Sequence, residues 1–330
     1  ISGQDYFTFG KAQFKPSARD VFNLEGNWSR THFLVPFDST QGFADDRQTD
    51  VNSFANLGWR HRFGDLDSAS VSSSELFTGF YYRHGSLSYI PGVGDDPGFF
   101  FFPDTTTPYN IAEQRNFDTY GTKVDFRWRA THALELKTGV QASVTTGRED
   151  FVSTDGAGNS GPGSSSGLKG HDVGVYVQDS YTPFEWMELR TGVRYDSHVA
   201  PFAGDQHQVS PRVKLSFFPN LSNTFYVYYG RQFIPTNIED LRSITTVSEG
   251  DTTSTSPTLP ERDDFYEVGY VHRFPAGIVW KLSGYLKNSS PGIDDNTIAG
   301  TAIVTSVHLG EVRVRGVETV LEVRDRKSVG

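Results

Sequence analysis

Apolar and polar residues alternate along most of this chain with a period of two. In residues 187–196, Met, Leu, Thr, Val and Tyr occupy the odd positions, while Glu, Arg, Gly, Arg and Asp occupy the even ones. Successive side chains of a β-strand point to opposite faces, so this pattern predicts a strand with one apolar and one polar face. The same alternation recurs at 22–29, 123–129, 134–141, 212–217 and 280–287. No long stretch has the 3.6-residue period of a helix.

The predicted strands are joined by connections that alternate between short and long. Short, turn-rich connections fall near 15–18, 63–65, 130–132, 182–184, 219–222 and 275–277. Long polar stretches lie at 34–51, 86–116, 149–169, 197–208, 233–261 and 288–302. We count about 13 strands. Short periplasmic turns and long extracellular loops are typical of an antiparallel transmembrane β-barrel, whereas a soluble sandwich or propeller is the alternative.

The composition fits a sheet of which only one face is apolar. Apolar residues make up 36% of the 330 residues and aromatic residues 14%, and the chain has 33 Gly. On two successive predicted strands, one face carries Lys123, Asp125, Arg127, Arg129, Glu135 and Lys137. Each Lys or Arg would cost about 2–4 kcal/mol on a lipid-facing surface at mid-membrane, so we expect this face to line the lumen. The five Trp suit the interfacial girdles of a barrel.

Several classes of function are disfavoured by residues that the chain does not contain. It has no Cys, which excludes disulfides and thiolate chemistry, and its net charge of −10 argues against nucleic-acid binding. No metalloprotease, hydrolase or phosphate-loop motif occurs, so we predict no catalytic, cofactor-binding or metal-binding residues. Four Asp-Asp pairs (45–46, 95–96, 263–264 and 294–295) do not have the ligand spacing of a calcium loop, and we interpret them as solvated.

One cluster of aromatic residues is a candidate ligand-binding site. Phe99, Phe100, Phe101 and Phe102 lie in a polar predicted loop, with Tyr109 nearby. Consecutive exposed aromatic side chains could form part of a ligand mouth. The alternative is that they fold over the barrel rim as a small local core.

A series of short motifs resembles the barrel of the TonB-dependent outer-membrane receptors. The motifs occur in the family's order, from about residue 170 onward. They are Tyr176-Val177-Gln178-Asp179, Gly192-Val193-Arg194-Tyr195-Asp196, Ser210-Pro211-Arg212, Tyr229-Gly230-Arg231-Gln232-Phe233-Ile234-Pro235, Pro260-Glu261-Arg262 with Tyr266-Glu267-Val268-Gly269-Tyr270, and Arg315-Gly316-Val317-Glu318. We interpret these motifs as mainly architectural, and we expect Glu261, Arg262 and Glu267 to pair with charges on neighbouring strands or on a plug. Two earlier segments, 9–12 and 33–38, are similar to the branch with a carboxypeptidase-regulatory-like N-terminal domain.

The resemblance implies a transporter and not an enzyme. Members of the family take up bulky nutrients across the outer membrane of Gram-negative-type bacteria, with energy from TonB. It further implies that lipid surrounds the barrel, that the nutrient binds to extracellular loops, and that TonB contacts the plug region. Siderophore, cobalamin and glycan all remain open as ligands. A passive outer-membrane porin is the first alternative, and a soluble extracellular glycan-binding β-protein is the second.

The resemblance also predicts how the chain is organised. The family's barrel has about 22 strands and is preceded by a globular plug. We therefore expect residues 1–324 to be a piece of such a barrel, without the plug and the TonB-contacting segment. Residues 325–330 break the alternation, and we interpret them as a non-native read-through tail.

Overall fold

The protein is built almost entirely of β-strands. The computed structural model describes residues 3–35, 46–64, 73–92, 109–201, 204–240, 258–297 and 303–323. The strands of this part are β1 (Gly3–Phe14), β2 (Asp20–Leu34), β3 (Arg47–Phe63), β4 (Ser74–Ile90), β5 (Tyr109–Arg129), β6 (Leu134–Asp155), β7 (Ser160–Phe184), β8 (Met187–Ala200), β9 (Gly204–Asn220), β10 (Asn223–Ile234), β11 (Glu261–Arg273), β12 (Ile278–Ser289), β13 (Gly292–Thr297), β14 (Val304–Leu309) and β15 (Val312–Val323). Two 3-10 turns, η1 (Ile238–Asp240) and η2 (Pro275–Gly277), accompany them.

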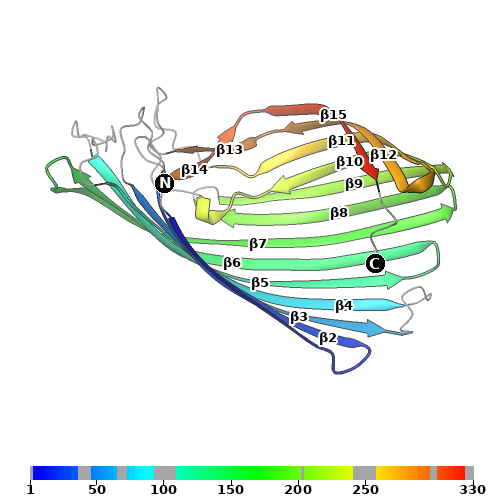
Figure 1. The fold of residues 1–330 in the computed structure, drawn as a ribbon, viewed down its shortest axis with the longest axis horizontal. Coiled ribbons are helices and arrows are strands. Elements are labelled where there is room, and N and C mark those ends of the chain that lie inside the picture. Colours follow the sequence, from blue (N-terminus) through cyan, green and yellow to red (C-terminus); the bar gives the residue numbers. More distant parts are fainter. Residues whose placement is uncertain are drawn as a thin grey trace.

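Thirteen of these strands form one antiparallel sheet. The order is β1 to β12 in sequence, followed by β15, so consecutive strands from β1 to β12 are also neighbours in the sheet. Strands β13 and β14 form a separate two-stranded hairpin between β12 and β15. Figure 1 shows the large sheet as a curved wall, with β1 and β15 at its two lateral edges. The predicted strand count and antiparallel architecture are confirmed.

The connections sort onto two opposite ends of the wall. Short turns such as 15–19, 130–133 and 221–222 lie together at the right of Figure 1, which we call the turn end. The opposite loop end carries the β6–β7 tip and the β13–β14 hairpin. This is the segregation that the alternating connections predicted.

Two of the predicted long loops are wrong. The stretch 149–169 lies largely within β6 and β7, which are joined by residues 156–159 alone. Glu149 pairs with Ser166 in the strand register, and Asp150 pairs with Ser165. The stretch 197–208 likewise belongs to β8 and β9. Because ladder hydrogen bonds use the backbone, paired neighbours hold Gly and Ser in a strand despite their low β propensity.

The convex, outer face of the wall is apolar, and the inner face is polar. Across four strands, Leu215, Val227 and Val268 form one outward row that ends at Gly284. These three apolar side chains are exposed, with 40%, 51% and 60% of their surface accessible. Within the described ranges nine apolar residues are buried, and eight of them form two small clusters, one of Tyr89, Ile111, Phe151 and Ile303 and one of Phe117, Leu168, Ala200 and Ile238. The large apolar surface therefore faces outward, where a membrane would cover it.

Aromatic side chains gather on the outer face close to the turn end. Phe184 and Trp186 stack at 5.0 Å between ring centroids, and Trp186 meets Phe217 edge-on at 5.7 Å. Tyr270 contacts Trp280 in the same way at 6.0 Å. An aromatic belt at one membrane interface has this arrangement.

Candidate ligand-binding hollows on the inner face

A short segment after β10 crosses the inner face at the loop end. We call residues 235–240, which include η1, the inner strap. The Glu239 carboxylate forms an ion pair with Arg83 of β4 at 2.8 Å. Arg115 of β5 donates to the Glu239 backbone carbonyl. The strap thus leaves the wall at Ile234 and is tied to it again five to six strands away.

The strap is also held by an apolar contact. Ile238 is 5% exposed and packs with Phe117, Leu168 and Ala200 on β5, β7 and β8. Gly170 makes this contact possible, because a Cβ there would overlap the Ile238 side chain. The surfaces of the strap and the wall are therefore complementary in shape.

The strap roofs a hollow of about 500 Å³ at the loop end. Its wall is polar: His198 is 2% exposed and its Nδ1 lies 2.6 Å from Asp172, which also accepts from Ser143 at 3.3 Å. Arg194 is paired with Asp196 at 2.7 Å. On the strap, Thr236 is 5% exposed, and its Oγ1 has no hydrogen-bond partner within the described residues. The hollow is therefore lined mainly by hydrogen-bonding and charged side chains, which suit a polar group.

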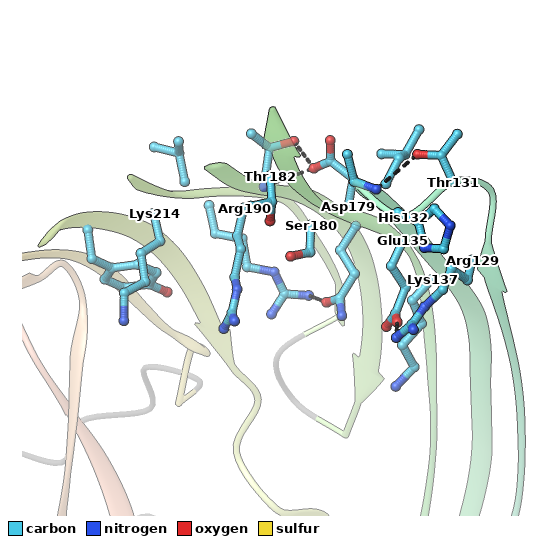
Figure 2. A pocket seen from close by; sticks show the side chains of 17 residues that line it. Arg129, Thr131, His132, Glu135, Lys137, Asp179, Ser180, Thr182, Arg190 and Lys214 are labelled. Carbon is cyan, nitrogen blue, oxygen red and sulfur yellow. Dashed lines mark hydrogen bonds and ion pairs between the residues drawn. The ribbon is translucent and has the colours of Figure 1, made fainter. Parts of the chain in front are cut away.

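A second hollow of about 700 Å³ lies toward the turn end (Figure 2). Part of its lining is the charged ladder that the sequence predicts on β5 and β6. Asp125 pairs with Lys123 at 3.3 Å and with Lys137 at 3.7 Å. Glu135 pairs with Arg127 at 3.6 Å and with Arg129 at 3.4 Å. The six residues do share one face, as predicted.

The aromatic ligand candidates are placed only in part. Phe99, Phe100, Phe101 and Phe102 lie outside the described residues. Tyr109 is the first residue of β5 and is partly buried, and it is not among the residues that line either hollow. Its ring lies against Gly161 of β7, where a Cβ would overlap it. This contact gives the Tyr109 ring a packing role.

The motif residues expected to form charge pairs behave differently from one another. Glu261 pairs with Lys287 at 2.6 Å and also accepts from the backbone N–H of Ile293, which fastens the start of the β13–β14 hairpin. Arg262 donates instead to the side-chain amide oxygens of Gln206 and Gln208. Glu267 accepts from the Tyr226 hydroxyl at 2.6 Å. The prediction is confirmed for Glu261, and among the described residues the hydrogen-bond partners of Arg262 and Glu267 are uncharged.

Sequence reasoning did not find the residues of the loop-end hollow. Thr236 follows directly after the motif that ends at Pro235, and Ile238 lies two residues further on, but the sequence indicates only an architectural role for that motif. Arg83, Asp172 and His198 come from three other strands, and no local pattern connects them. The register of β7 and β8 places Asp172 opposite His198, and the curved wall and the strap bring Arg83 to the same hollow.

In the part of the chain that the structure describes, no helix is long and apolar enough to cross a membrane. No group of three or more His, Asp or Glu side chains in the same ranges is arranged to hold a metal ion.

A curved antiparallel sheet with an apolar outer face, a polar inner face and turns sorted to one end is the wall of a transmembrane β-barrel. The sequence profile described as "TonB dependent receptor-like, beta-barrel" matches residues 2–325. The chain belongs to the TonB-dependent receptor β-barrel family.

Solved structures have the same fold. The chain is similar to a structure titled "Copper transporter OprC", with a TM-score of 0.71 and 15% identity over 98% of this chain and 51% of that one. It is also similar to the siderophore receptor PiuA from Acinetobacter baumannii (TM-score 0.65, 14% identity, 97% and 54% coverage). The ferric yersiniabactin uptake receptor FyuA from Yersinia pestis gives a TM-score of 0.65 at 9% identity, with 97% and 52% coverage. The chain spans about half the length of these structures. A search of curated protein sequences finds no match.

Proposed function

We propose that the protein acts in the outer membrane as a receptor that takes up a bulky nutrient with energy from TonB. The observation that carries this proposal is the loop-end hollow beneath the inner strap, because it places hydrogen-bonding and charged side chains where a ligand would enter the lumen. Family membership supports the TonB requirement, and the similar structures are named as siderophore and copper transporters. We propose a transporter rather than an enzyme on the same grounds.

The nutrient itself is proposed only by its chemistry. The hollow presents hydroxyl groups, two guanidinium groups, carboxylates and a buried imidazole, from Ser143, Thr236, Arg83, Arg194, Asp172, Asp196 and His198. These groups form directional hydrogen bonds, so we propose a polar ligand with several donors and acceptors. A ferric siderophore, a cobalamin and an oligosaccharide all meet this requirement.

The deciding experiment is uptake by cells that express this protein, with and without TonB. Representative siderophores, cobalamin and oligosaccharides are supplied, and accumulation is measured. We expect at least one compound to accumulate only when TonB is present. Accumulation that is independent of TonB would instead support the passive porin, and recovery of the protein in the soluble fraction would support the extracellular glycan-binding protein.

The site within the barrel can be tested with the compound that the uptake experiment identifies. Thr236→Val removes the buried hydroxyl while keeping the side-chain shape. Loss of one hydrogen bond to the ligand should weaken binding about tenfold. Thr8→Val, at an exposed position of β1, is the matched control and should leave binding unchanged. Equal affinity in both variants would remove Thr236 from the site.

A further inference from the structure

Strand β7 is paired on both sides along only part of its length. Residues 160–170 pair with β6, but pairing with β8 begins at His171, which lies opposite Val199. Strand β8 ends at the next residue, Ala200. The segment 160–170 therefore has β6 on one side and, among the residues that the structure describes, no strand on the other. We call residues 163–169 the β7 edge.

Two contacts farther along β7 show which backbone groups point to the free side. The Thr182 N–H donates to the Ala133 carbonyl, and the Thr138 hydroxyl of β6 donates to the Tyr176 carbonyl. Even-numbered residues of β7 therefore direct their backbone groups toward β6. Because these groups alternate sides along a strand, those of the odd-numbered residues point the other way. In the β7 edge, the odd-numbered residues are Gly163, Ser165, Gly167 and Lys169.

The β7 edge lies beyond the apolar band of the outer face. Outward side chains of β7 are apolar and exposed at Val173, Val175 and Val177. From His171 to Gly163, the outward positions carry polar side chains or Gly. Water and other proteins can therefore reach the edge. Its free groups point along the plane of the wall, so their surroundings do not depend on what fills the lumen.

The β7 edge does not have the features that usually protect a free strand. Proteins block such edges with Pro, with several charged side chains, with a bulge or with a covering element. The β7 edge contains no Pro, and its one charged residue, Lys169, lies at its end. The irregularity in the β6–β7 register lies before Gly163. The edge is thus regular, and it can accept another strand.

The side chains of the edge indicate which kind of strand fits beside it. A Cβ at Gly167 would meet nothing within 4 Å, and a Cβ at Gly163 would meet only the Phe151 carbonyl, at 3.1 Å. Aromatic side chains on a neighbouring strand can cover such edge glycines. Lys169 is exposed, and an acidic side chain opposite it would form a favourable cross-strand pair.

We propose that the β7 edge binds an extended segment of another protein, which joins the wall as a strand antiparallel to β7. The free N–H and C=O groups then gain partners, because another extended backbone presents donors and acceptors at the same spacing. The preferred segment has aromatic side chains opposite Gly163 and Gly167 and an acidic side chain opposite Lys169. This binding surface is separate from the hollow proposed for the nutrient.

Binding of a designed peptide to the complete receptor chain, purified in detergent, tests this site. The peptide Glu-Val-Tyr-Thr-Thr-Thr-Tyr places its Glu opposite Lys169 and its two Tyr opposite Gly167 and Gly163 in the antiparallel register. We expect the labelled peptide to bind, as measured by fluorescence anisotropy. The same peptide with N-methyl groups on its third and fifth residues cannot donate to the edge. It should bind about tenfold more weakly, because two hydrogen bonds are lost.

Ser165→Pro and Ser165→Ala are a matched pair of variants of the protein. Both remove the Ser165 hydroxyl, which hydrogen-bonds to Asp150, and only the Pro variant also removes the N–H on the free side. Pro is tolerated in an edge strand where its N–H is not part of the ladder, so the pairing with β6 should remain. We expect S165P to weaken peptide binding about tenfold and S165A to change it less than about threefold.

Residue-resolved hydrogen exchange shows whether the peptide adds as a strand. Without peptide, the amides of Ser165 and Gly167 should exchange faster than those of Ser164 and Ser166, which face β6. The peptide should slow the exchange of the first pair and leave the second pair unchanged. Three results would overturn the proposal: no binding of the peptide, equal binding of the peptide and its N-methylated form, or slow exchange at Ser165 and Gly167 without peptide. The last result would mean that the edge is already covered.

Discussion

At the scale of single residues, the shape of the inner face depends on where side chains are large and where glycines leave space. Ile238 fills a socket on the wall only because Gly170 has no side chain. Gly167 lies on the same strand, three residues away, and a Cβ there would meet nothing within 4 Å. Two glycines of one strand therefore have different physical roles, although the sequence alone does not distinguish them.

This difference gives a mutational prediction. Gly170→Ala should displace the inner strap, because the new Cβ overlaps Ile238 and the Val199 carbonyl, and overpacking of this kind costs about 1–3 kcal/mol. Limited proteolysis should cut the strap faster in this variant than in the wild type. Gly167→Ala is the control and should behave as the wild type does. Equal cleavage of the two variants would contradict the fit between strap and socket.

At the scale of elements, the long strands exceed what a membrane needs. β6 has 22 residues and β7 has 25, whereas about 9–11 residues of a tilted strand cross a bilayer. The hairpin therefore projects beyond the membrane at the loop end. At its tip, the side-chain amide and the backbone N–H of Asn159 both donate hydrogen bonds to the Asp155 carboxylate. These hydrogen bonds hold the pKa of that carboxyl below its ordinary value. These bonds organise the four-residue turn.

The same two strands show how far the sequence predicts the fold. Alternation is clear at 134–141, where apolar side chains face outward and polar ones inward, and that part was predicted correctly. Beyond the membrane the outer face no longer meets lipid, so the regular apolar half of the signal disappears at 149–169 although the backbone pairing continues. The charged ladder on β5 and β6 was predictable because it depends on the same alternation. The loop-end hollow was not, because it depends on contacts between distant strands such as Arg83 with Glu239.

The two ends of the wall should face opposite sides of the outer membrane. The chain contains no Cys, so single cysteines can be introduced without background labelling. Ala157→Cys lies at the β6–β7 tip, and Leu221→Cys lies in a short turn where the native side chain is 97% exposed. A membrane-impermeant maleimide should label the first in intact cells. It should label the second only after the outer membrane is permeabilised, and the reverse pattern would invert the proposed orientation.

At the scale of the whole molecule, the wall is open. Strands β1 and β15 are the edges of the large sheet, and each is paired on one side only within the described residues. Lipid cannot satisfy the unpaired backbone groups of such an edge. We therefore propose that residues 1–324 form part of a larger barrel whose remaining strands close the two edges.

This proposal predicts how the 330 residues behave on their own. Expressed without further strands and reconstituted into liposomes, the chain should not yield a closed monomer. Closed barrels often keep their compact mobility in detergent gels unless heated, so unheated and heated samples are compared. We expect no compact monomeric band in the unheated sample. A heat-modifiable monomer would contradict the proposal.

The inner strap has a mechanical consequence. It is continuous with β10 at one side and tied to β4 and β5 at the other, so it forms a chord across the arc of the wall. A chord of fixed length resists flattening of its arc, and any widening of the barrel must first break the Arg83–Glu239 ion pair or withdraw Ile238 from its socket. The strap therefore couples the curvature of the wall to the opening of the hollow that it covers.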